Sequence, residues 1–300
     1  MSAPSDSIAP RPTRVDYDRI QSLCYVGSYQ RRIPVSITRM IENAYDWEHL
    51  PFVHSSTFSD IKLIESGDWG WRADLGSANT GGKDRSQIEL LVDSEKNYWA
   101  TTVVTGKGRG VEIHTQATAL GDQEIDIEVR FYLPRSSNWV YRKLVHWTLK
   151  RQYHQLYEED EALMQGRQRA VDQNKRWKQN LEKPQTRVRV AQLSELDKEQ
   201  GKTVETSHGR FRIVYREDEW RAYSTTCPHQ LGDLEEATVS EDGTITCPWH
   251  GYRFSIESGA NLDGKCKNLQ IPSVVIDEMQ TLFLELDVQL KDRGKIHTRI

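Results

Sequence analysis

The spacing of apolar residues changes several times along this chain, and each change marks a predicted element. From Ser36, apolar residues recur every three to four positions, which predicts a helix over 36–50 that Pro51 would end. From about 61 to 133 the period is two, with Gly, Asp, Asn and Ser between the runs, so an antiparallel meander is expected. A helical period returns from about 137 to 179.

A polar, charged run that ends near Pro184 separates these elements from a region of short alternating runs such as RFRIVYR and TLFLELD. Such runs predict a small all-β unit. The predicted fold class is therefore α+β, with two domains. We assign a disordered tail to 1–14, the first domain to 15–180, a linker to 181–186 and the second domain to 187–300.

Composition and charge exclude several classes of protein. The 300 residues are 37% hydrophobic and 28% charged, with a net charge of −4, which suits a soluble globular protein. We expect no nucleic-acid or membrane partner, because neither a basic field nor a run of about 18 apolar residues is present. Four cysteines are too few for a disulfide-stapled secreted fold of this length, so a cytoplasmic protein is expected.

Two segments of the second domain combine cysteine with histidine. Cys227 and His229 stand in CPHQLGDL, and Cys247 and His250 stand in CPWHGYRF, with seventeen residues between the pairs. Two mixed pairs on two loops suit a [2Fe–2S] cluster held by two cysteines and two histidines. A structural zinc site with the same ligand types usually pairs cysteine with cysteine and histidine with histidine, so it is the weaker interpretation.

The chain resembles the Rieske family over 186–287, through these two segments. The resemblance implies that the cysteines hold the inner iron of the cluster and the histidines the outer one. Respiratory and photosynthetic members carry one further cysteine in each cluster loop, where this chain has Gly232 and Trp249. It is therefore similar to the ferredoxin and oxygenase branch, which receives electrons from a reductase.

A second set of metal-ligand residues lies in the first domain. Asn43, Asp46 and His49 are spaced by three, so they would share one face of the predicted helix. His54 follows Pro51, and the two histidines can converge on one metal ion if the chain turns at that proline.

The long helix supplies a candidate third ligand. Asp160 falls in the middle of the apolar stripe of this helix, whereas Glu159 and Glu161 lie about 100° to either side and suit a solvated face. A carboxylate that faces a core is costly unless it is paired or bound to metal. Two histidines and one carboxylate form the facial triad of non-haem Fe(II) enzymes.

The pattern Asn-X2-Asp-X2-His-X4-His resembles the catalytic domain of Rieske non-haem iron oxygenases, although the order of the two domains is reversed here. The resemblance implies a helix-grip (START-like) catalytic domain in which His49, His54 and Asp160 hold a mononuclear Fe(II). It also implies that Asp46 is the electron-transfer bridge between a Rieske histidine and an iron-ligand histidine, with Asn43 beside it in the catalytic site.

These expectations make the chain the terminal oxygenase of a Rieske system. It would use O2 and electrons from an NAD(P)H-dependent reductase, directly or through a ferredoxin, to hydroxylate, demethylate or dihydroxylate a small organic substrate. A homo-oligomer is expected, most simply a trimer. Two alternatives stay open: a non-enzymatic Rieske ferredoxin fused to a helix-grip ligand-binding domain, and a first domain in which Asp46, His49 and His54 are only capping and core-edge residues.

Overall fold

The computed structural model describes residues 12–135, 138–179 and 186–286, which divide into two compact units. The first unit extends to Glu161 and the second begins at Ala162, so the division between the two compact units lies inside a helix. Most of that linker, and most of the predicted N-terminal tail, fall outside the described residues.

The first unit is built on one antiparallel sheet of seven strands, in the order β1-β7-β6-β5-β4-β3-β2. Strands β2 to β7 form the meander that the period of two predicts. β1 was not predicted, and it pairs with β7 along its whole length. The strands are β1 (Cys24–Ile33), β2 (Phe58–Gly67), β3 (Gly70–Ser77), β4 (Arg85–Asp93), β5 (Tyr98–Val103), β6 (Glu112–Gly121) and β7 (Glu124–Leu133).

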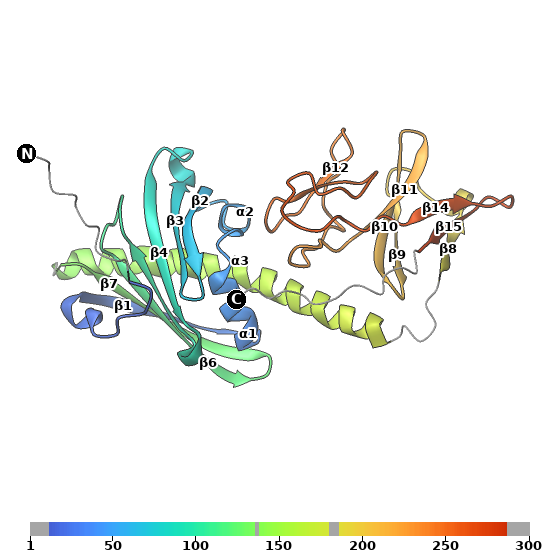
Figure 1. Cartoon of the computed structure of the whole chain (residues 1–300). Helices are drawn as coiled ribbons and strands as arrows, with labels where there is room; N and C mark the ends of the chain where they lie inside the picture. The colour runs from blue at the N-terminus through green and yellow to red at the C-terminus, as the bar shows by residue number, and fades with distance from the viewer. Residues whose placement is uncertain (1–11, 136–137, 180–185, 287–300) are drawn as a thin grey trace, which may run out of the picture. The chain divides into compact units, whose positions relative to one another are not determined.

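The long helix α3 (Trp139–Gln179) follows β7, and its first half packs on one face of the sheet (Figure 1). The Tyr153 ring lies 5.4 Å from that of Phe131 in β7, and the Tyr157 ring stacks on that of Tyr29 in β1 at 6.3 Å. Aromatic pairs at these separations bury large apolar areas between the two layers. An antiparallel sheet packed on a long C-terminal helix is the helix-grip arrangement, so the fold expected for the first domain is confirmed.

The single helix predicted over 36–50 is wrong. The structure has two helices, α1 (Ile37–Tyr45) and α2 (Leu50–Val53), separated by a break in which Asp46 turns away with ψ of 91°. Pro51 lies in the first turn of α2, where its missing N–H is not needed. This proline therefore helps to begin the second helix instead of ending the first.

Charged residues are buried on the other face of the sheet. Arg72, Glu112 and His114 are each no more than 3% exposed. They are covered by the segment that precedes β1: the Pro12 carbonyl accepts a hydrogen bond from Arg72, and Arg19 pairs with Glu112. The end of the predicted disordered tail is thus ordered against the sheet.

The second unit begins with the end of α3 and continues as a small all-β fold of three sheets, β11-β10-β9, β12-β13 and β14-β15-β8. β14 was not predicted. The strands are β8 (Arg187–Gln192), β9 (Lys202–Thr206), β10 (Gly209–Arg216), β11 (Glu219–Ser224), β12 (Thr244–Thr246), β13 (Arg253–Ser255), β14 (Ser273–Ile276) and β15 (Thr281–Glu285).

The all-β region has two apolar cores. One surrounds Phe211 and Ile213 of β10, and the other surrounds Phe254 of β13 and contains Cys227 and Cys247. The predicted α+β fold class, with a helix-grip domain and a small all-β domain, is therefore confirmed. In the described part of the chain, no helix is both long and apolar enough to pass through a bilayer.

Candidate metal centres

The two histidines of the first unit stand at either end of the short helix α2. His49 is the residue before α2 and His54 the residue after it, and their rings lie 5.2 Å apart. One helical turn is enough to bring both side chains to the same side. The prediction that Asn43, Asp46 and His49 share a face of one helix is wrong, because α1 ends before Asp46.

Asp160 of α3 faces both histidines. Its Oδ1 atom lies 3.3 Å from Nε2 of His49 and 3.0 Å from Nε2 of His54. All three side chains are buried, and one candidate ligand atom from each lies within 4.8 Å of the others.

The three side chains pass a simple test of whether they fit a metal ion. Asp160 Oδ1 and both ring nitrogens of His49 are buried, and none of them has a hydrogen bond of good geometry to any residue that the structure describes. Buried polar atoms nearly always have a partner. Two imidazoles and a carboxylate with open valences fit a divalent transition-metal ion.

The histidine and carboxylate side chains of this cluster stabilise one another's charged forms. Burial alone would lower the pKa of His49, but the carboxylates of Asp160 and Asp46 outweigh it and raise this pKa to about 10. Burial would raise the pKa of Asp160, but the adjacent imidazoles of His54 and His49 hold it well below its usual value. The metal-free cluster therefore carries a protonated His49 and an ionised Asp160 at neutral pH.

Glu159 is a site residue that sequence reasoning missed. Its Oε2 atom lies 2.7 Å from Nδ1 of His54, and its side chain is only 27% exposed. When Nε2 binds a metal ion, a carboxylate on Nδ1 holds the proton of the ring there and fixes the orientation of the ring. Glu159 is offset by about 100° from the apolar stripe of α3, which predicts a solvated residue. The same offset also allows its carboxylate to contact a histidine at the side of the helix. Glu161, on the other side, pairs with Arg31 at 2.7 Å.

The other two predicted residues of this site lie beside the triad. Asp46 Oδ2 is 3.8 Å from Nδ1 of His49, and the Asp46 side chain is 6% exposed. Asn43 is buried and lines the adjoining cavity. The structure therefore brings Asn43, Asp46, His49, His54 and Asp160 into one region of the first unit.

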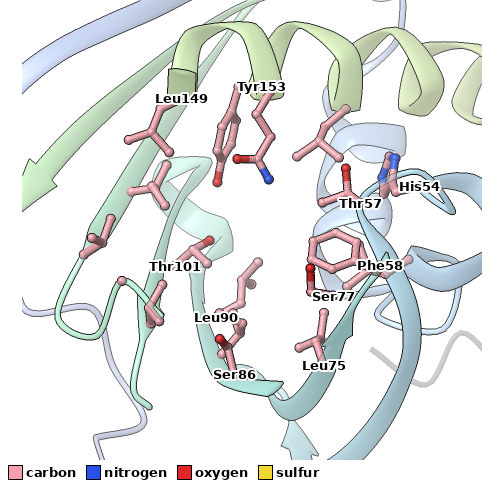
Figure 2. Close-up of a pocket in the computed structure, with 18 of the residues that line it drawn as sticks. His54, Thr57, Phe58, Leu75, Ser77, Ser86, Leu90, Thr101, Leu149 and Tyr153 are labelled. Carbon is pink, nitrogen blue, oxygen red and sulfur yellow. The ribbon is translucent and has the colours of Figure 1, made fainter. Parts of the chain in front are cut away.

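A cavity of about 530 Å³ opens beside the triad, between α3 and the sheet (Figure 2). Leu75, Leu90, Phe58 and Leu149 are among its apolar lining residues, and His54 stands at one side of it (Figure 2). A mostly apolar cavity with a few convergent polar groups is typical of a binding site for a small organic molecule.

In the second unit, the two cysteine and histidine segments adopt the same turn. The Cys227 amide donates to the Gly232 carbonyl, and the Leu231 amide donates back to the Cys227 carbonyl. In the other segment, the Cys247 amide donates to the Tyr252 carbonyl, and the Gly251 amide donates back to the Cys247 carbonyl. Leu231 and Gly251, the fifth residues of the two loops, share a left-handed φ of 67°. The two loops therefore share a backbone turn, in which the histidine is the third residue of one loop and the fourth residue of the other.

The predicted cluster ligands converge in these loops. Both thiols are buried, and the rings of His229 and His250 are 4.7 Å apart and nearly perpendicular. The pKa of Cys247 is lowered, mainly by a hydrogen bond with Cys227 and further by His250, against the effect of burial. Two cysteines and two histidines that converge in this way fit a Rieske iron–sulfur cluster.

Glycine is required at position 232. A Cβ atom there would lie 2.7 Å from the Cys247 sulfur, so any other side chain would fill the space beside this ligand. The cysteine that respiratory family members place here would not fit.

The second half of α3 supports both cluster loops within the same unit. Arg167 donates a hydrogen bond to Gln230, next to His229. Gly166 leaves room for the Trp249 indole, since a Cβ atom at 166 would lie 2.9 Å from it.

Comparisons with known proteins agree with this arrangement. Residues 186–274 match the family model described as Rieske [2Fe–2S] domain. The ferredoxin component of an alkene monooxygenase system from Xanthobacter autotrophicus is 37% identical over 51 residues, which are 17% of this chain and 42% of that protein. The chain thus matches less than half the length of this relative.

Two solved structures are similar to separate parts of the chain. The ferredoxin of carbazole 1,9a-dioxygenase from Nocardioides aromaticivorans IC177 covers 34% of this chain and 100% of its own, at 26% identity and a TM-score of 0.31. A START superfamily protein from Mycobacterium smegmatis covers 46% and 97%, at 16% identity and a TM-score of 0.37. Together, the ligand loops and the family match identify residues 186–274 as a Rieske [2Fe–2S] electron-transfer domain, joined in this chain to an N-terminal helix-grip domain.

Proposed function

We propose that this chain is the terminal oxygenase of a Rieske non-haem iron system. The observation that carries the proposal is the convergence of His49, His54 and Asp160 beside an apolar cavity, on a chain that also has a Rieske domain. Two imidazoles and one carboxylate leave coordination positions open on Fe(II), as oxygen-activating enzymes require. The substrate would be a small organic molecule that is hydroxylated, demethylated or dihydroxylated.

His49 and His54 would hold the iron through Nε2, and Asp160 through Oδ1. When bound, the iron supplies the activation of O2 by electrons from the cluster. Glu159 holds the proton at Nδ1 of His54 and keeps that ring oriented. The walls of the cavity exclude water and hold the substrate beside the triad.

The [2Fe–2S] cluster of the Rieske domain would be held by Cys227 and Cys247 on one iron and by His229 and His250 on the other. Its electrons would come from an NAD(P)H-dependent reductase, directly or through a ferredoxin. Asp46, which lies beside His49, would bridge a Rieske histidine and the iron site. We propose further that the chain forms a closed homo-oligomer, most simply a trimer, in which the bridge joins neighbouring subunits.

Iron analysis tests the proposal directly. The purified chain should contain about three irons, two in the cluster and one in the triad. Asp160→Ala should lower this number to two and leave the visible spectrum of the cluster unchanged.

A second candidate function is a non-enzymatic electron carrier fused to a ligand-binding domain. This candidate is favoured because the matched relative is the ferredoxin component of its system and one of the similar solved structures is a ferredoxin. Two irons in the wild-type chain, with no effect of Asp160→Ala, would support this candidate and contradict the oxygenase.

A further inference from the structure

The cavity beside the triad is lined by several polar side chains that the proposed chemistry does not use, and two of them lie together on α3. Gln152 and Tyr153 are consecutive residues of α3, and both line the cavity. The Tyr153 hydroxyl points into the open space (Figure 2). Neither side chain has a hydrogen bond to another residue in the described ranges, in contrast to Gln155, which bonds Ser56 and Glu159.

The backbone positions of these two residues lie at a defined distance from that of Asp160. Seven or eight residues of α3 separate them, which is a rise of about 10 to 12 Å along the helix at 1.5 Å per residue. Between the two ends the wall is mainly apolar, and it includes Trp71 and Trp99 from the sheet. A molecule that reaches from the triad to Tyr153 therefore passes through apolar surroundings.

The volume of the cavity limits the size of its ligand. A volume of 530 Å³ lies within the range of about 300 to 1,000 Å³ that is typical of sites for drug-sized molecules. A single aromatic ring would leave most of this space unfilled. Three fused rings, or an aliphatic skeleton of similar length, would occupy more of it without crowding the walls.

The charge of the lining excludes ionic ligands from the interior. Asp84 and Lys107 are the charged lining residues outside the triad region in the described part of the chain, and both are exposed. A carboxylate or ammonium held at Tyr153 would lose its hydration, and the only opposite charges in the lining outside the triad region, among the described residues, are those two exposed side chains; such a transfer is costly. A hydroxyl or carbonyl would instead regain hydrogen bonds there.

We propose that this cavity binds an uncharged, mainly apolar molecule of about three fused rings, whose single hydroxyl or carbonyl is held by Tyr153 and Gln152 at the end away from the triad. The proposal rests on the proposed function in that this molecule would be the substrate. Tyr153 and Gln152 are then specificity-determining residues, which select for a polar group at the end of the molecule away from the reacting atom.

The test measures binding, and it uses the full-length protein with its triad left unloaded. Trp71 and Trp99 would transfer excitation energy to a bound anthracene, and calorimetry would give the affinity independently. The probes are anthracene, 2-hydroxyanthracene, anthracene-2-carboxylate and phenol. We expect 2-hydroxyanthracene to bind about tenfold more tightly than anthracene, and the carboxylate and phenol to bind more weakly than either.

Tyr153→Phe removes only the hydroxyl, so it should reduce the preference for 2-hydroxyanthracene about fivefold and leave anthracene binding unchanged. Gln152→Leu should act in the same direction, and Gln123→Leu, in the exposed turn between β6 and β7, is the matched control. Equal binding of the two three-ring probes by the wild type would overturn the proposal. So would a preference that survives both variants, or tighter binding of phenol or the carboxylate.

The outcome is independent of the oxygenase assignment, because iron content is measured separately. Three irons without the expected preference would refute the ligand class alone. Two irons together with the preference would retain the ligand site and refute the oxygenase.

Discussion

Glu159 offers a sharp test of how the metal site is built. Replacing it with alanine removes the carboxylate that lies 2.7 Å from Nδ1 of His54 and leaves every proposed ligand in place. The His54 ring then loses the partner that fixes its proton on Nδ1 and its plane toward Asp160. We expect the triad to bind a divalent metal ion more weakly, but not to lose it as Asp160→Ala would.

The expected size follows from the contact. A hydrogen bond to a charged group contributes about 1.5 to 3 kcal/mol, which corresponds to a factor of roughly 10 to 150 in affinity. The Glu159 side chain is 27% exposed, and solvent screening places the effect at the lower end. Loss of an outer partner of a metal-bound histidine typically weakens metal binding about 10- to 100-fold. We therefore expect a loss of about tenfold for Glu159→Ala and a smaller one for Glu159→Gln, which keeps an acceptor.

The assay is a titration of the metal-free triad with Fe(II) under anaerobic conditions, or with Co(II), whose visible bands report coordination. Glu158→Ala is the matched control, because Glu158 is on the same helix turn, is 56% exposed and contacts His154 rather than a triad histidine. If Glu158→Ala and Glu159→Ala change the affinity equally, the proposed orienting role of Glu159 is wrong.

Three further predictions concern the two metal sites. Cys227→Ser should abolish the visible spectrum of the cluster and leave about one iron per chain; a retained spectrum would reject the ligand assignment. Asp46→Asn should leave both sites loaded while product formation collapses, and mixing a cluster-deficient variant with Asp160→Ala should restore some activity if electrons pass between subunits. A fully active monomer in sedimentation would refute that route. Because the pKa of His49 is raised to about 10 in the metal-free protein, metal uptake must release its proton. The apparent affinity should thus rise about tenfold per pH unit between 7 and 9, and a flat profile would contradict the protonated state.

The elements with a strong local period could be predicted from the sequence. Strands β2 to β7 alternate because one face of the sheet meets α3, and four alternate residues of β7, Ile125, Ile127, Val129 and Phe131, are essentially unexposed. The same logic identified Asp160 as a carboxylate that faces inward. The Rieske domain was predictable because its ligand pairs lie within single loops, where spacing is visible in the sequence.

The features that depend on distant contacts could not be predicted in this way. β1 is specified by its pairing with β7, about a hundred residues later, and its own residues do not alternate. Glu159 lies off the apolar stripe, and its contact with Nδ1 of His54 can be seen only in the folded structure. Pro51 was assigned the wrong role because a proline suits the first turn of a helix as well as the end of one.

The short helix α2 gives the metal site a property that can be followed by hydrogen exchange. A helix of four residues has almost no stability of its own. The amides of Val53, His54 and Phe58 are nevertheless bonded to carbonyls of His49, Leu50 and His54, so they exchange only when this turn opens. Opening the turn would separate the two histidines that flank it. Exchange at these three amides therefore reports how often the ligand pair comes apart, and an ion that needs both rings would slow that exchange without any change in the fold.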